Sequence, residues 1–218
     1  MTSPLCLTFP ALEKYEFCRA VFLGKQPGID VQKEREEAIR NLRRSHIQAL
    51  TQLGLDKFSI AEVEQVHGNQ VAIVGPQISS QTYTNADALI TSARRVFLKI
   101  FVADCAAVYL VDRHGRAIGL AHSGRKGTEL EIVPATIRAL QETFDVSPSD
   151  LILQISPCIR PPHYEVDFAA DIIQQALTAG VTEISDCDIC TACHPDRYYS
   201  YRMEKGKTGR MAAVLALL

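Results

Sequence analysis

Residues 96–123 read VFLKIFVADCAAVYLVDRHGRAIGLAHS and contain three short apolar runs separated by polar breaks. The runs are Val96–Val102, Ala107–Val111 and Ala117–Ala121, and each has the length and the β-branched composition of a β-strand. His114-Gly115 lies between the last two runs and indicates a turn. Consecutive strands are therefore expected in the middle of the chain.

Helices and further strands are expected on both sides of this segment. Apolar residues recur at helical spacing in Asp30–Leu53, from Thr128 to Phe144 and in Asp167–Ala179, and Thr128-Glu129-Leu130-Glu131 has the form of a capping box. The additional expected strands are Phe58–Val63, Val71–Val74, Ala88–Thr91, Leu151–Ile155 and Tyr198–Arg202. Met211–Leu218 is apolar throughout, which fits either a buried strand or a buried helix. Strands grouped between helices without strict alternation predict an α+β fold.

Length and composition narrow the class of protein. The 218 residues contain no linker-like stretch, so a single domain spanning 1–218 is expected. A net charge of −2 gives no support to nucleic-acid binding, and the apolar runs are too short to span a membrane. The N-terminus lacks the pattern of a signal peptide, and seven cysteines, an odd number, favour a reducing compartment. We therefore expect a cytoplasmic protein, a monomer or a homodimer.

Three segments place a metal-binding or nucleophilic side chain next to a strand end: Gln65-Val66-His67-Gly68, Ala103-Asp104-Cys105 and Ala121-His122-Ser123-Gly124. If they converge, two imidazoles and one thiolate form a three-ligand zinc site with an open fourth position. The same residues allow another chemistry, in which His122 or His67 deprotonates Cys105 for nucleophilic attack and Asp104 orients the base. Composition does not choose between the two.

Two further groups of residues are candidate binding sites, one for an anion and one for a metal ion. Gly124-Arg125-Lys126-Gly127-Thr128 gathers two cations and exposed amides, which suits an anion or phosphate as well as an ordinary basic turn. Cys187-Asp188-Ile189-Cys190-Thr191-Ala192-Cys193-His194 has the spacing of a metal knuckle but lacks a second cysteine pair, so unliganded thiols are the commoner explanation. His163, beside prolines, gives no signal of its own.

Taken together, the segments resemble one family, the multicopper polyphenol oxidase or laccase-domain proteins, also described as purine nucleoside phosphorylases. The resemblance is strongest over residues 58–218. The matching stretches, in family order, are Gln65–Gly68, Ala86–Leu89, Ala103–Cys105, Ala121–Gly124 with Gly127-Thr128, Ser156–Ile159 with Tyr164–Val166, and Cys190-Thr191 through Ser200–Arg202 to Thr208–Arg210.

The resemblance implies a fold of mixed sheets packed between helices, layered α/β/β/α, similar to the catalytic domain of cytotoxic necrotizing factor. It implies that His67, Cys105 and His122 bind zinc or copper and form the catalytic centre. Zinc is favoured, because multicopper oxidation needs more histidines than the six scattered ones here. The implied substrates are a small nucleoside (adenosine, inosine or methylthioadenosine) and phosphate. Arg125, Lys126, Asp104 and Arg202 are then the candidate residues for binding them.

The resemblance also implies adenosine deamination and, in some accounts, phenol oxidation or peptidoglycan editing. One departure stands out: the family's usual Gly-Trp-Arg-Gly is Gly124-Arg125-Lys126-Gly127 here, which removes an aromatic ring and replaces a bidentate guanidinium. Two alternatives to a purine nucleoside enzyme therefore stay open. One is a metal-independent cysteine hydrolase or amidase, and the other is a nucleoside-binding protein without turnover.

Overall fold

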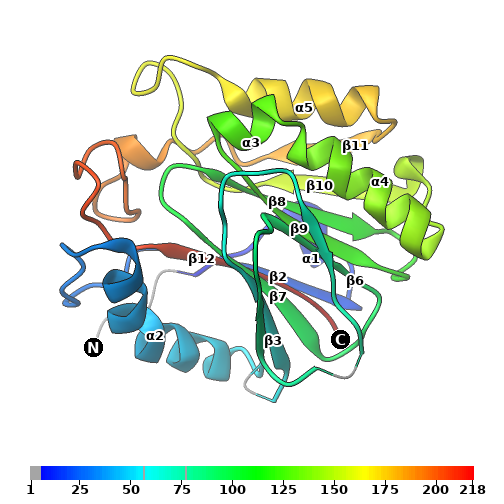
Figure 1. Cartoon of the computed structure of the whole chain (residues 1–218), viewed down its shortest axis with the longest axis horizontal. Helices are drawn as coiled ribbons and strands as arrows, with labels where there is room; N and C mark the ends of the chain where they lie inside the picture. Colours follow the sequence, from blue (N-terminus) through cyan, green and yellow to red (C-terminus); the bar gives the residue numbers. More distant parts are fainter. Residues whose placement is uncertain (1–5, 56, 77) are drawn as a thin grey trace.

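The computed structural model describes residues 6–55, 57–76 and 78–218. Residues 1–5, on which part of the expectation about a signal peptide rests, lie outside the described residues. Two mixed six-stranded sheets pack face to face, with helices on both outer faces (Figure 1). The α+β class and the α/β/β/α layering are therefore confirmed.

The first sheet has the order β1-β2-β12-β7-β3-β5. Its strands are β1 (Cys6–Leu7), β2 (Cys18–Leu23), β12 (Met211–Leu217), β7 (Val96–Val102), β3 (Ser59–Val63) and β5 (Gln81–Tyr83). Strand β12 is central and pairs antiparallel with both β2 and β7, while β3 pairs parallel with β7 and β5. The apolar C-terminal segment is thus a buried strand and not a helix.

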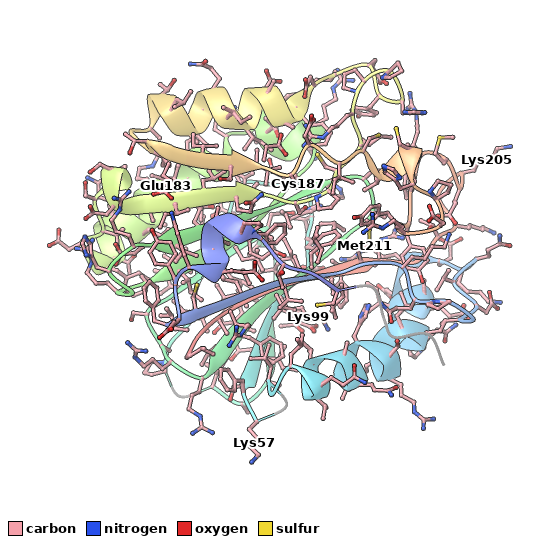
Figure 2. All side chains as sticks on the ribbon, turned by 180° about the vertical axis from the view of Figure 1, so that it is seen from behind. Lys57, Lys99, Glu183, Cys187, Lys205 and Met211 are labelled. Carbon is pink, nitrogen blue, oxygen red and sulfur yellow. The ribbon has the colours of Figure 1, made fainter. Side chains whose placement is uncertain are left out.

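The second sheet has the order β11-β10-β8-β9-β6-β4. Its strands are β11 (Glu183–Asp186), β10 (Leu151–Ile155), β8 (Ala106–Asp112), β9 (Ile118–Ser123), β6 (Ala88–Thr91) and β4 (Val71–Ile73). The pairs β8/β9, β8/β10 and β6/β9 are antiparallel, whereas β10/β11 and β4/β6 are parallel. Figure 2 labels Glu183, the first residue of β11, and Cys187, which directly follows its last residue.

The layering explains why the strands are apolar without alternation. Along β7, Leu98 and Ile100 enter the core between the sheets, whereas Phe97 and Phe101 pack on the other face near α2 (Arg35–Gln52). Both faces of the strand are covered, so both need apolar side chains. The outer face of the second sheet packs against α4 (Ile132–Phe144) and α5 (Phe168–Thr178) (Figure 1).

The helix boundaries differ from expectation at two points. Helix α2 begins at Arg35, five residues after Asp30, because the Asp30 carboxylate accepts a hydrogen bond from the Gln32 amide and does not cap the helix. The prediction that Thr128–Glu131 forms a capping box is also wrong. Thr128 lies inside a short helix α3 (Arg125–Glu129), where its hydroxyl donates to the Gly124 carbonyl, and Glu131 at φ +61° separates α3 from α4.

The expected strand Tyr198–Arg202 does not form. Tyr198 and Tyr199 are fully buried, and the segment turns because its backbone bonds locally, with the Tyr198 amide donating to the His194 carbonyl. Strands β1, β2, β5 and β11 and the short helix α1 (Pro10–Glu13) were not predicted from the sequence.

Candidate active site and metal centre

Strand register brings Cys105 to the end of β9. Ala106, the first residue of β8, pairs with Ser123, the last residue of β9, so Cys105 lies opposite Gly124. A Cβ atom on Gly124 would overlap the sulfur of Cys105. Glycine is therefore needed at this position for the thiol to lie over the strand end.

Asp87 orients His122 from the neighbouring strand. Asp87 directly precedes β6, which pairs with β9, and its carbonyl accepts the amide hydrogen of His122 at 2.8 Å. The Asp87 carboxylate lies 2.9 Å from His122 Nδ1. A proton on Nδ1 is held by this carboxylate, which leaves Nε2 to face a ligand.

The same carboxylate holds the loop that carries His67. The amides of Val66, His67 and Gly68 donate to Asp87 at 3.1, 2.9 and 2.7 Å, respectively. His67 has φ +60°, a left-handed conformation that is rare for residues other than glycine, and these three bonds compensate for it. The His67 and His122 rings meet edge to face at 4.8 Å between their centroids.

His67, Cys105 and His122 therefore converge as expected. Their candidate ligand atoms all lie within 4.8 Å of one another. His122 is buried, Cys105 is half-buried and His67 is exposed, so the group opens toward solvent on one side. Two imidazoles and one thiolate with an open position fit a catalytic zinc site, and their softness also suits copper.

The electrostatics of the group favour a charged pair. Burial alone raises the pKa of the Cys105 thiol, but His122 and His67 outweigh burial and lower this pKa to about 6. Burial alone lowers the pKa of His122, whereas the Cys105 thiolate and Asp87 raise it to about 9. In the protein without metal, Cys105 is thus a thiolate and His122 an imidazolium near neutral pH.

The group lines a cavity of about 730 Å³ that also contains cations and aromatic rings. The cationic residues of its lining are Arg35, Arg125, Arg202, Lys205 and Arg210. The aromatic residues are Phe101, Tyr164, Phe168 and Tyr201. Lys205 is labelled in Figure 2, on the loop beyond the short helix at residues 191–193. The cavity therefore combines candidate metal ligands, positive charge and flat aromatic surfaces.

Of the residues expected to bind phosphate or substrate, Arg125 and Arg202 line the cavity and Lys126 does not. Lys126 is exposed on α3. Arg202 pairs with Glu165 at 2.8 Å, and Arg125 lies 3.8 Å from the same carboxylate. Glu165 thus holds both guanidinium groups together at the cavity.

Asp104 also lines the cavity, but the hydrogen-bond partners of its carboxylate are not histidines. It accepts hydrogen bonds from the Thr191 hydroxyl at 2.6 Å, the Ser200 hydroxyl at 3.0 Å and the Arg202 amide at 2.7 Å. The expectation that Asp104 orients the base is therefore wrong, and Asp87 occupies that position. The sequence signal for Asp87 was its place directly before a strand, which it shares with Cys105.

The layered fold, and the group of two histidines and one cysteine at the adjoining ends of β8 and β9, agree with the resemblance to the laccase-domain class of proteins. Residues 24–177 and 166–218 match the family described as multi-copper polyphenol oxidoreductase laccase, and the chain belongs to this family. Among its relatives is a purine nucleoside phosphorylase of Corynebacterium glutamicum, 30% identical over 192 residues, covering 76% of this chain and 77% of that protein. Another, of Streptomyces coelicolor, is 28% identical over 195 residues, covering 78% and 79%, respectively.

Solved structures support the same fold. YlmD from Geobacillus stearothermophilus superposes with a TM-score of 0.79 at 25% identity, covering 96% of this chain and 94% of that one. The hypothetical protein YfiH of Bacillus licheniformis has a TM-score of 0.84 at 20% identity, covering 94% and 95%. Within the described residues, no helix combines the length and apolar character needed to cross a membrane.

Proposed function

We propose that the chain is a purine nucleoside phosphorylase with its reaction centre at His67, Cys105 and His122. The observation that carries the proposal is that one cavity contains this metal-binding group, several cations and four aromatic rings. Phosphorolysis requires an anion site, a flat site for the base and stabilisation of developing charge, and the cavity offers all three. The names of the relatives from Corynebacterium and Streptomyces support the same activity.

The cations are arranged to attract phosphate. Arg35 and Arg210 both line the cavity, and burial together with the charge of Arg35 lowers the pKa of Arg210. A phosphate dianion relieves such repulsion. Arg125 and Arg202 add a second pair of guanidinium groups. Both pair with Glu165, so at least one of these ion pairs would have to break for its arginine to bind phosphate. We infer that phosphate binds among these arginines and that one of its oxygens attacks the anomeric carbon of the ribose. The bond from this carbon to the base nitrogen breaks as the new bond forms, so the products are ribose 1-phosphate and the free base, which takes up a proton.

The aromatic side chains of the cavity would bind the purine base, and the candidate metal ligands would lie near the reacting atoms. Tyr164, with the Arg202 guanidinium 5.3 Å above its ring, and the exposed Tyr201 present flat surfaces on which a purine can stack. Asp87 keeps a proton on His122 Nδ1 and so fixes the ring orientation. A zinc ion held by the three ligands would polarise a substrate oxygen as a Lewis acid.

The proposal is tested by chromatography of adenosine, inosine and methylthioadenosine incubated with and without phosphate. We expect phosphate-dependent release of free base by the parent protein and loss of at least ~100-fold in rate in Cys105→Ala. Cys6→Ala, an exposed cysteine on an edge strand, is the matched control and should keep full rate. The same chromatograms report deamination, as conversion of adenosine to inosine. A fully metallated parent that releases no base would contradict the proposal.

A second candidate is a cysteine hydrolase, and one observation favours it. Asp87, His122 and Cys105 form a carboxylate–imidazole–thiolate series, and the pKa of Cys105 is already lowered to about 6. This chemistry needs no metal. Activity on an amide or ester substrate that survives chelation and is abolished by alkylation of Cys105 would support it and exclude a metal-dependent phosphorylase.

A further inference from the structure

A second group of metal-binding side chains lies outside the cavity. His163, Cys190 and Cys193 place their candidate ligand atoms within 4.8 Å of one another. Cys190 directly precedes a short 3₁₀ helix (Thr191–Cys193) and Cys193 is its last residue, so both sulfurs lie near the loop that carries His163. His163 thus meets two cysteines that lie 27 and 30 positions later in the chain, although no sequence pattern had singled it out.

The two sulfur-to-nitrogen separations are close to those of a tetrahedral zinc site. His163 Nδ1 lies 3.5 Å from Cys193 Sγ and 3.8 Å from Cys190 Sγ. Zinc bonds of about 2.3 Å to sulfur and about 2.0 Å to nitrogen, at tetrahedral angles, separate a sulfur from a nitrogen ligand by about 3.5 Å. The side chains are therefore already placed around a point where one ion would reach all three.

We propose that His163, Cys190 and Cys193 form a second zinc site, distinct from the group at His67. Cys190 is buried, His163 is half-buried and Cys193 is exposed, so the fourth position faces solvent and is open to water. Two thiolates and one imidazole suit zinc, and the Cys-x-x-Cys spacing is a common zinc-binding element.

This site joins the two segments that form one side of the catalytic cavity. The His163 loop continues into Tyr164, which lines the cavity, and the cysteine turn contains Thr191, whose hydroxyl donates to Asp104. The amide of Ile159 donates to the Asp104 carbonyl at 2.8 Å, so both segments hold the residue that precedes Cys105. A zinc ion at the second site therefore fixes the wall of the first.

The test is metal analysis of untagged protein purified with a thiol reductant. A Cys105→Ala/His122→Ala variant, which lacks the first site, should keep one equivalent of zinc. Adding Cys190→Ser and Cys193→Ser should remove it, whereas adding Cys187→Ser, in the same segment but outside the group, should not. With cobalt in place of zinc, the thiolate-to-cobalt absorption band should follow the same pattern.

A measurement without substitutions guards against variants that fail to fold. Zinc added to the metal-free parent should protect Cys190 and Cys193, but not the exposed Cys6, from alkylation mapped by mass spectrometry. The proposal is overturned if the folded, reduced Cys105→Ala/His122→Ala variant binds no zinc, or if Cys190 and Cys193 form a disulfide with each other in the reductant-treated protein.

Discussion

The carboxylate of Asp87 holds two parts of the site in place, the loop that carries His67 and the ring of His122. Its carboxylate accepts from the amides of Val66, His67 and Gly68 and lies against His122. Burial alone raises the pKa of Asp87, but the hydrogen bond with His122 and those from the loop amides outweigh burial and lower it. The residue is thus held as a carboxylate.

Substitution Asp87→Asn should therefore weaken the whole site. The amide NH2 of asparagine cannot accept the loop hydrogen bonds, and loss of such outer partners costs about 10–100-fold in metal affinity or activity. Zinc dissociation constants and kcat/KM measure the effect. Asp171→Asn, an exposed residue on α5, is the control, and equal values for the two variants would contradict the assigned role.

His46 is a buried residue that predicts a pH dependence of stability. It lies on α2, stacked on Phe101 at 6.0 Å between ring centroids, and among the described residues neither ring nitrogen has a hydrogen-bond partner. Burial, with a smaller effect of Lys99, lowers its pKa from 6.5 to about 3. Below pH 6.5 His46 is therefore protonated in the unfolded chain but stays neutral in the folded chain. The free energy of unfolding consequently decreases as the pH falls from 6.5 toward 3.

Substitution His46→Leu should remove this loss. Between pH 7 and pH 4.5 the parent should lose about 2–3 kcal/mol of unfolding free energy more than the variant. Urea unfolding of the metal-free proteins at both pH values measures the difference. His114→Gln, at an exposed histidine, should behave like the parent. A parallel pH dependence of parent and His46→Leu would show that His46 is not the group responsible.

At the scale of elements, the pairing of β8 with β9 decides how close Cys105 and Gly124 come. Substitution Gly124→Ala would place a methyl group on the sulfur of Cys105 and turn the thiol away from the histidines. We expect a loss of about tenfold or more in zinc affinity at the first site, measured by competition with a chelating dye.

Gly127→Ala is the matched control for this prediction. It lies three residues later in α3, and its added Cβ would meet atoms only at ordinary contact distances, the nearest being the His122 carbonyl oxygen at 3.4 Å. Unchanged zinc affinity in Gly124→Ala would mean that the thiol does not depend on this close approach.

At the scale of the whole molecule, the last strand along the chain is in the middle of a sheet. Strand β12 pairs with β2 on one side and β7 on the other, and its side chains enter three of the hydrophobic clusters. Deletion of residues 211–218 should therefore split the first sheet and abolish cooperative folding.

Circular dichroism and thermal unfolding of the truncated chain test this prediction. Deletion of residues 1–7, which removes the edge strand β1, is the control and should leave a folded protein. A cooperative unfolding transition in the chain without residues 211–218 would show that β2 and β7 pair without β12.

Local sequence pattern was sufficient to predict much of the fold and to single out the three candidate ligands of the first site. Val96–Val102, Ala88–Thr91 and Leu151–Ile155 are strands with the expected bounds, because a short apolar run is a property of neighbouring residues. His67, Cys105 and His122 were found because each lies at a strand end beside a turn or loop.

The sequence by itself therefore determined many of the strands, the α+β class and the resemblance to the family, together with the three candidate ligands. Only the tertiary structure decided that Asp87, and not Asp104, orients His122, and that His163 meets Cys190 and Cys193. The physical reason is that these convergences depend on strand register and on loops that close over long stretches of chain. Strand register and loop closure produce no repeating pattern in the sequence of the residues that they bring together.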